Sequence, residues 1–139
     1  PGIDGRKMSK SYDNAVFLSD TSDAVVKKVN QMFTDPEKAK KNDKGHPDNC
    51  VVHAFHGVYN ADISKAITDE CRKGQRGCVD CKMELAKKLN EVLEPIRQKR
   101  MEIEKKPDYV KDVMNAGNKN AREASEKTMS EVRKLMKLI

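Results

Sequence analysis

Apolar side chains recur every three or four residues along most of the chain after residue 20, the spacing that places them on one face of an α-helix. The first such segment follows a Thr-Ser-Asp run at 21–23, which offers helix N-cap side chains, and stops before Pro36. A second segment, with Asp48 as its expected cap, runs to about residue 60, and a third continues from 63 to 71. The side chains predicted to face inward are Ala24, Val25, Val29, Met32, Phe33, Val51, Phe55, Val58, Tyr59, Ile63, Ala66 and Ile67.

The second half of the chain predicts three more helices. A long one starts near Val79 and contains Pro95, which removes one backbone hydrogen bond and predicts a kink. Another opens at Pro107 and ends at Gly117–Asn118, and the last one starts near Asn120. Their expected inward faces are Leu85, Leu89, Val92, Leu93 and Ile96, then Tyr109, Val110, Val113 and Met114, and finally Ala121, Ala124, Thr128, Val132, Leu135 and Ile139.

Composition agrees with an all-α fold. Charged residues make up 36% of the 139 residues and aromatic residues only 4%, with no Trp. A β-sandwich relies on aromatic and β-branched strands, whereas exposed helix faces are naturally filled with Lys and Glu. We therefore expect a helical bundle at 21–139, preceded by an irregular arm at 1–20, with an exposed Lys-rich loop at 36–47.

The charge balance and the apolar runs limit where the protein works. The formal net charge is +6, which suits a polyanionic partner. The chain contains no apolar run of membrane-spanning length, and its start lacks the apolar core of a signal peptide and an initiator Met. We expect no membrane contact, a cytoplasmic location without disulfides, and a chain that is part of a longer protein.

Four cysteines fall within one 32-residue window of the chain: Cys50, Cys71, Cys78 and Cys81. The last two form a C-x2-C pair after Gly77, which permits a tight turn and brings two sulfurs towards one centre. Cys50 is expected at the start of one helix and Cys71 at the end of the next, and in an antiparallel pair those two ends are neighbours. Four buried thiols without a metal are the simpler explanation, but the clustering favours a metal site.

The spacing leaves the kind of metal open. Four Cys ligands suit tetrahedral zinc, and they equally suit an iron–sulfur cluster. A zinc ribbon usually carries two C-x2-C pairs, and this chain carries one.

The segment KMSKS, formed by Lys7, Met8, Ser9, Lys10 and Ser11, has the chemistry of a phosphate-binding loop. Two ammonium groups on a glycine-flanked segment can close over phosphate oxygens, and the two hydroxyls add hydrogen bonds. Such a loop is able to stabilise a charged transition state. For an arbitrary string of this kind, a solvated linker is the usual explanation.

This string is not arbitrary, because KMSKS is the second signature of class I aminoacyl-tRNA synthetases. Together, PGIDGRKMSKSYDN, the Thr34–Pro36 segment, PDNCVV and GCVDCKMELAKKLNEVLEPIR resemble the C-terminal part of a bacterial-type tryptophanyl-tRNA synthetase over nearly the whole chain. The resemblance implies a Rossmann catalytic domain followed by a helical anticodon-binding domain, with residues 1–20 belonging to the catalytic domain. It also implies activation of tryptophan with ATP and Mg, transfer to tRNA(Trp), and a homodimer when full-length.

The resemblance further assigns roles to the candidate residues. Lys7 and Lys10 match the catalytic loop lysines that neutralise the phosphates as pyrophosphate leaves, within an ATP-binding segment at 7–11. A subset of the family carries four cysteines with gaps like those of this chain and a 4Fe–4S cluster, although its first gap is usually about two residues longer. That likeness favours 4Fe–4S over zinc.

The class's first signature, HIGH, does not occur in these 139 residues. We therefore expect no tryptophanyl-adenylate synthesis by this chain alone. The alternative is a free-standing, zinc-stapled helical module that binds RNA or another protein.

Basic residues near the cysteines are the candidate tRNA contacts. Single-stranded bases are read by stacking and edge hydrogen bonds while basic side chains hold phosphates, and aromatic residues are scarce here. The candidates are Lys73, Arg76 and Lys82 around the cysteine window, and Arg97, Lys99 and Arg100 after Pro95. Each of them taken singly is more often just a solvated charge.

Overall fold

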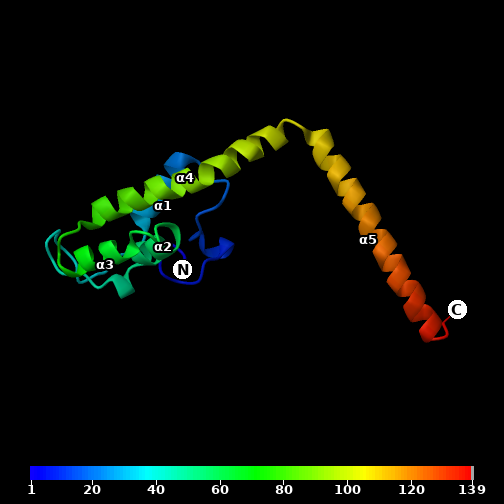
Figure 1. The fold of residues 1–139 in the computed structure, drawn as a ribbon, viewed down its shortest axis with the longest axis horizontal. Helices are drawn as coiled ribbons and strands as arrows, with labels where there is room; N and C mark the ends of the chain where they lie inside the picture. The colour runs from blue at the N-terminus through cyan, green and yellow to red at the C-terminus, as the bar shows by residue number, and fades with distance from the viewer. Residues whose placement is uncertain (139) are drawn as a thin grey trace. The chain divides into compact units, whose positions relative to one another are not determined.

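The computed structural model describes residues 1–138, and within them it is helical, with no β-strand (Figure 1). The elements in chain order are η1 (Lys10–Tyr12), α1 (Ser22–Gln31), η2 (Pro47–Asn49), α2 (Val51–Tyr59), α3 (Ser64–Arg72), α4 (Cys78–Glu104) and α5 (Pro107–Leu135). The all-α prediction is confirmed. Ile139, expected on the inward face of the last helix, lies outside the described residues.

The chain divides into two compact units, one ending at Arg97 and the other beginning at Gln98. The first unit holds α1 to α3 and most of α4, and α4 runs alongside the shorter helices (Figure 1). Its core is formed by apolar side chains from three helices: Val25, Val29 and Met32 of α1 and its end, Val51, Val52 and Phe55 of α2, and Leu85, Ala86, Leu89 and Leu93 of α4. The core holds together segments that are distant in sequence and positions the loops between them.

The N-cap predicted for α1 is confirmed, and the N-cap predicted for α2 is wrong. Thr21 is the N-cap of α1, and its hydroxyl accepts a 3.2 Å hydrogen bond from the Ala24 amide. The N-cap of α2 is Cys50, without a side-chain capping bond, so the prediction of Asp48 as cap is wrong. The reason is that Pro47 starts the short 3-10 turn η2, which places Asp48 one turn too early.

Helix α4 is one continuous helix with Pro95 inside it. Its buried face consists of Leu85, Leu89 and Leu93, with Ala86. Val92 and Ile96, which were expected to face inward, are 41% and 40% exposed. The same correction applies to Phe33, Val58, Tyr59 and Ile63, which are also exposed.

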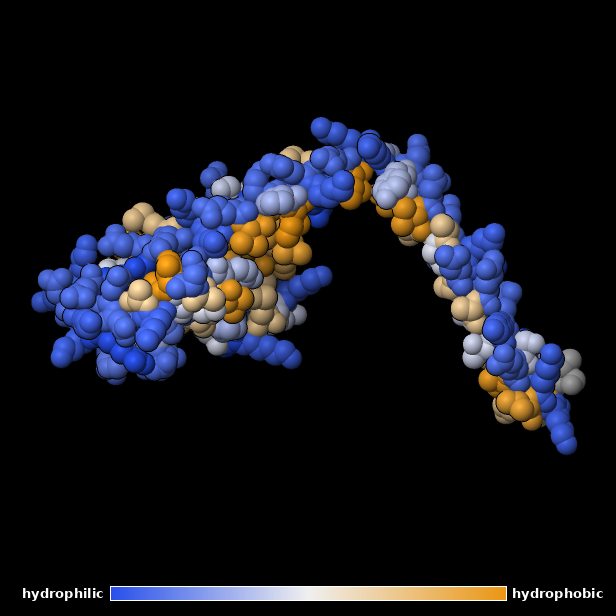
Figure 2. Space-filling model, viewed as in Figure 1, coloured by the Kyte–Doolittle hydropathy of each residue, from blue (hydrophilic) through white to orange (hydrophobic). Residues whose placement is uncertain are grey.

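Helix α5 is longer and more exposed than its pattern suggests. It passes through Gly117 without a break, so the predicted end at Gly117–Asn118 is wrong. One glycine costs a helix only about 1 kcal/mol, and Ala116, Lys119 and Ala121 near it favour the helix. No residue of α5 is buried, which corrects every inward placement predicted for this stretch: Tyr109, Val110, Val113, Met114, Ala121, Ala124, Thr128, Val132 and Leu135. Figure 2 shows hydrophobic residues on its surface.

The N-terminal arm is irregular, as expected, apart from the short turn η1. It is folded against the rest of the unit. Asn14 and Ala15 are only 2% and 4% exposed, and the Phe33 amide donates a 2.8 Å hydrogen bond to the Ile3 carbonyl. These contacts hold the arm against the first unit.

Candidate functional site

The KMSKS segment forms a closed loop around the side chain of Asn14. The Asn14 amide nitrogen donates to Asp4 Oδ1 at 2.8 Å and to the Lys7 carbonyl at 3.2 Å, and its oxygen accepts from the Ser9 amide at 2.8 Å. Ser9 then caps η1, because its hydroxyl accepts a hydrogen bond from the Ser11 amide at 3.2 Å. The backbone that carries both lysines is thus held at several points.

Charged contacts support the same loop from its first turn. Asp4 forms a 2.7 Å ion pair with Arg6, whose guanidinium stacks over the Tyr12 ring at 4.5 Å. The hydrogen bond from Asn14, followed by those from Arg6, lowers the pKa of Asp4 to about 2. The side chains of Lys7 and Lys10 are exposed. The loop therefore presents two cations to solvent from a fixed backbone, which is an arrangement suited to phosphate.

The four cysteines line one pocket. Cys50 precedes α2, Cys71 lies in the last turn of α3, and Cys78 and Cys81 lie in the first turn of α4. The expected meeting of a helix start with the end of the next helix is confirmed. Among residues 1–138, however, no three His, Cys, Asp or Glu side chains are arranged around the position of a single metal ion.

Burial and neighbouring charges act against each other at these sulfurs. Burial raises the pKa of the Cys71, Cys78 and Cys81 thiols. The Lys38 ammonium opposes this rise at Cys71 and Cys78, and the Arg76 guanidinium opposes it at Cys81. The pKa of each of these three thiols stays above its usual value, so the two cations offset the effect of burial only in part.

The loop at 36–47 crosses directly over the pocket. Lys38 is buried, and its ammonium donates to the carbonyls of Lys41 and Asp43. The Gly45 amide donates to the Cys71 carbonyl at 3.0 Å, and a Cβ at Gly45 would lie 2.6 Å from the Cys71 sulfur. Most of the loop is exposed, as predicted, but Lys38, Gly45 and Pro47 are buried. At Gly45 its backbone passes so close to the Cys71 sulfur that a larger residue would force a shift.

A buried carboxylate holds this loop in place. Asp35 accepts hydrogen bonds from the amides of Glu37 and His46, at 3.0 and 2.7 Å, and from His46 Nδ1 at 3.0 Å. Burial alone would raise the pKa of Asp35, but the hydrogen bonds from His46 and Glu37 outweigh it and the pKa lies below its usual value.

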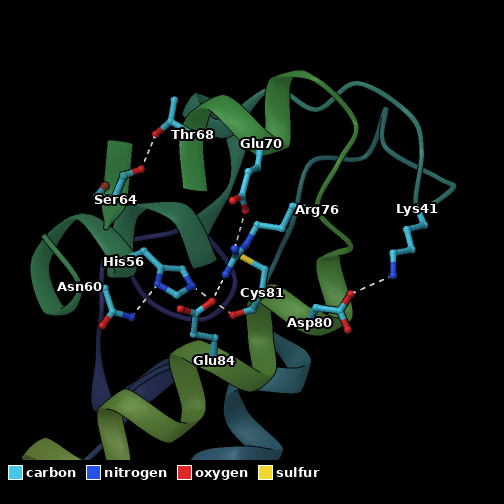
Figure 3. Close-up of polar contacts among 10 residues, drawn as sticks. All are labelled: Lys41, His56, Asn60, Ser64, Thr68, Glu70, Arg76, Asp80, Cys81 and Glu84. Carbon is cyan, nitrogen blue, oxygen red and sulfur yellow. Dashed lines mark hydrogen bonds and ion pairs between the residues drawn. The ribbon is translucent and has the colours of Figure 1, made fainter. Parts of the chain in front are cut away.

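The polar groups around Cys81 come from three elements (Figure 3). Asn60 donates to Nδ1 of the fully buried His56 at 2.9 Å, so the His56 proton lies on Nε2 and is donated to the Cys81 carbonyl at 3.0 Å. Burial lowers the pKa of His56, which keeps the ring neutral. Arg76 joins Glu70 of α3 to Glu84 of α4 through its two terminal nitrogens.

The donor set of this pocket fits a thiolate-bound metal centre. All four potential ligands are sulfurs, as both structural zinc sites and iron–sulfur clusters use. One nitrogen of Arg76, Nε, is buried at the same pocket without a hydrogen-bond partner among the described residues. The guanidinium interacts with the Cys81 thiol, so a group bound through this sulfur would lie next to Nε.

Most of the basic candidates for RNA contact are engaged within the protein. Arg76 and Arg97 are 15% and 12% exposed, and Arg97 donates to the Asp20 carbonyl at 2.7 Å. Lys82 donates to the Asn30 carbonyl at 2.8 Å. The remaining candidates have exposed side chains: Lys73, and Lys99 and Arg100, which are each paired with a glutamate on α4.

Comparison with known proteins places the chain in a family. Residues 1–94 match the model of the tRNA synthetases class I (W and Y). The chain belongs to this family. This synthetase chain is 51% identical to the tryptophan–tRNA ligase of Aquifex aeolicus, in an alignment that covers 99% of the chain and 35% of that protein. It is 40% identical to the tryptophan–tRNA ligase of Thermotoga maritima, in an alignment that covers 100% of the chain and 43% of that protein. The synthetase chain thus spans less than half the length of these relatives.

Solved structures agree on the fold. The tryptophanyl-tRNA synthetase from Campylobacter jejuni, whose crystal structure contains ADP and tryptophan, matches 97% of this synthetase chain and 42% of its own chain, with a TM-score of 0.83 at 24% identity. The tryptophanyl-tRNA synthetase from Aeropyrum pernix K1 matches 73% of this chain and 29% of its own chain, with a TM-score of 0.62 at 31% identity. Within residues 1–138, no helix is long and apolar enough to cross a membrane.

Sequence reasoning missed several residues that build these sites. Asn14 stands three residues after KMSKS and was not singled out, although Asn is a frequent turn-closing residue. Lys38 was hidden in a Lys-rich run whose other members are exposed. The roles of Gly45 and Asp35 could not be predicted from the sequence, because Gly45 contacts Cys71 and Asp35 contacts His46, both well separated from them along the chain.

Proposed function

We propose that this chain supplies two parts of a tryptophan–tRNA ligase, the KMSKS loop and a helical tRNA-binding region with a four-cysteine centre. The family match over residues 1–94 carries the proposal, because it includes both the loop and all four cysteines. The tryptophan ligases among the relatives favour tryptophan over tyrosine as substrate.

The loop residues act on the phosphates of ATP. Lys7 and Lys10 neutralise negative charge as pyrophosphate leaves, and the backbone that carries them is held around Asn14. Met8, Ser9 and Ser11 complete the ATP-binding segment, with Mg bound by the nucleotide. The adenylate-forming reaction belongs to the longer protein, so we expect the 139-residue chain to show no tryptophan-dependent pyrophosphate exchange.

The four cysteines hold a 4Fe–4S cluster, with zinc as the alternative. Cys50, Cys71, Cys78 and Cys81 would be its ligands, and the cluster would cross-link the start of α2, the end of α3 and the start of α4. Its contribution is to order this region. The pocket's Lys38 and Arg76 offset part of the negative charge of the ligands.

Among the RNA candidates, the exposed Lys73, Lys99 and Arg100 are the best placed to reach phosphates. The other three candidates, Arg76, Lys82 and Arg97, form hydrogen bonds within the protein, so we expect them to stabilise the fold and not to bind RNA. Because phosphate contacts release counterions, tRNA binding by this region should weaken steeply with salt.

The test is binding of tRNA(Trp) to the purified chain over a range of salt concentrations. We expect measurable binding, and Lys73→Ala should reduce the slope of log affinity against log salt by about 1. Lys127→Ala, on the exposed surface of α5, is the matched control and should leave the slope unchanged. Absence of binding, or binding indifferent to salt, would contradict the tRNA part of the proposal. If the anaerobically purified chain contains zinc and no iron, the group held by the four cysteines is zinc and not an iron–sulfur cluster.

A further inference from the structure

Arg76 occupies a position that its ion pairs alone do not explain. It lies between the end of α3 and the start of α4, and its Nη1 bonds Glu70 at 2.8 Å while its Nη2 bonds Glu84 (Figure 3). These two carboxylates hold the plane of the guanidinium in one orientation. The side chain is 15% exposed, so little water reaches it.

The third nitrogen of this guanidinium makes no well-aligned hydrogen bond. Among the buried side-chain nitrogen and oxygen atoms of residues 1–138, Arg76 Nε is left without such a partner. Buried N–H groups are almost always paired in folded proteins, and the acceptor available to this guanidinium is the Cys81 sulfur, whose interaction with it raises the pKa of Arg76 and opposes the rise in the pKa of Cys81. Arg76 lines the cysteine pocket, and the Cys81 sulfur lies beside its guanidinium (Figure 3).

We propose that Arg76 is a positioning residue of the four-cysteine centre, with its Nε–H held by Glu70 and Glu84 to donate a hydrogen bond to a sulfur of the bound iron–sulfur group. This inference rests on the proposed cluster. It gives Arg76 a role in the metal centre in place of the RNA contact that its charge suggested from the sequence.

The hydrogen bond has a measurable consequence beyond stability. Reduction adds negative charge to a cluster and its sulfurs, and a hydrogen bond to sulfur stabilises that charge. The guanidinium also stays protonated at every working pH, so its contribution does not titrate. Losing the bond should therefore lower the midpoint potential of the cluster, whereas losing a purely structural clamp would only loosen the fold.

The experiment compares Arg76→Lys, Arg76→Gln and the control Arg72→Gln in the full 139-residue chain. Each protein is loaded anaerobically with equal amounts of ferric and ferrous iron and with sulfide, which gives the oxidised cluster without a further oxidant, and is then titrated with dithionite, which supplies the electron. Arg76→Lys keeps the positive charge but loses the planar fork, so it isolates the hydrogen bond from the charge. Arg72 is 57% exposed and pairs only with Asp48, which makes its variant a matched loss of one arginine.

We expect the midpoint potential to fall in Arg76→Lys, to fall further in Arg76→Gln, and to stay at the wild-type value in Arg72→Gln. Far-UV circular dichroism shows whether Arg76→Lys is folded. A folded Arg76→Lys chain that binds less iron than Arg72→Gln would also support the role. An unchanged potential in both Arg76 variants would overturn it, and so would an Arg76→Lys chain that does not fold, because Arg76 would then be a structural clamp. If the wild-type chain takes up no iron and sulfide, the proposed cluster is contradicted, and this inference fails with it.

Discussion

The side-chain amide of Asn14 donates a 2.8 Å hydrogen bond to the carboxylate of Asp4, ten residues earlier in the chain. The same side chain also binds the Lys7 carbonyl and the Ser9 amide. One buried residue thus determines the path of the segment that carries Lys7 and Lys10. The closeness of Gly2, where a Cβ would lie 2.4 Å from Asn14 Nδ2, shows how tightly the loop closes on it.

Replacing Asn14 by Ala should release the KMSKS loop. The Ser9 amide would lose its acceptor, and a hydrogen bond of this kind contributes about 1 kcal/mol. Amide hydrogen exchange of the residues at 7–13 should then become faster, while the helices keep their protection. Asn118→Ala, on the exposed surface of α5, should leave exchange in the loop unchanged, and equal exchange in both variants would show that Asn14 does not order the loop.

Gly45 and Gly57 form a matched pair for testing the pocket. Gly45→Ala places a Cβ 2.6 Å from the Cys71 sulfur and should cost about 1–3 kcal/mol of unfolding free energy, because the thiol or the loop must move. Gly57→Ala meets no atom within 4 Å and lies inside α2, where it should stabilise the protein by about 0.5–1 kcal/mol.

Urea unfolding followed by circular dichroism measures both glycine variants. Metal uptake should fall in Gly45→Ala and stay unchanged in Gly57→Ala. Equal stability of the two variants would contradict the close crossing of the loop over Cys71.

Acid should weaken the loop that Asp35 holds. The pKa of Asp35 in the folded protein lies below 3.8, so the folded state favours the charged carboxylate more than the unfolded chain does. Its contribution to stability is fully present above pH 3.8 and is lost as the pH falls through the lower, folded pKa. Asp35→Asn should therefore be less stable than wild type near neutral pH, with the difference shrinking in acid.

Thermal unfolding at a series of pH values tests this dependence. Asp48→Asn is the control, because the Asp48 side chain is 80% exposed and pairs with Arg72 at 3.4 Å. A stability difference for Asp35→Asn that stays constant as the pH falls would argue against the buried carboxylate.

Leu89 and Val92 should differ sharply although both belong to the apolar stripe of α4. Leu89 is 3% exposed within the core, so Leu89→Ala should cost about 2–5 kcal/mol. Val92 is 41% exposed, so Val92→Ala should change stability by no more than about 0.5 kcal/mol. Denaturant unfolding of the two variants compares them directly, and a similar loss in both would place Val92 in the core as well.

Local features of the sequence were enough to predict the helices of the first unit. Thr21 caps α1 as predicted, and the apolar spacing around Leu85 and Leu89 marks the buried side of α4. These features depend on neighbours within a few residues, so they can be read directly from the chain. The wrong boundaries, at Asp48 and Gly117, arose where a short turn or a tolerated glycine competed with an equally plausible local signal.

The sequence by itself determined the helical class, the family resemblance and the residues with the chemistry for phosphate and metal binding, because residue type and spacing carry that information. Only the tertiary structure decided which of these residues act together. It buried Lys38 over the pocket, tied Arg76 to Glu70 and Glu84, and closed the KMSKS loop on Asn14. Such roles depend on contacts between segments far apart in the chain, and charge or spacing alone does not distinguish an arginine that binds RNA from one that holds two helices.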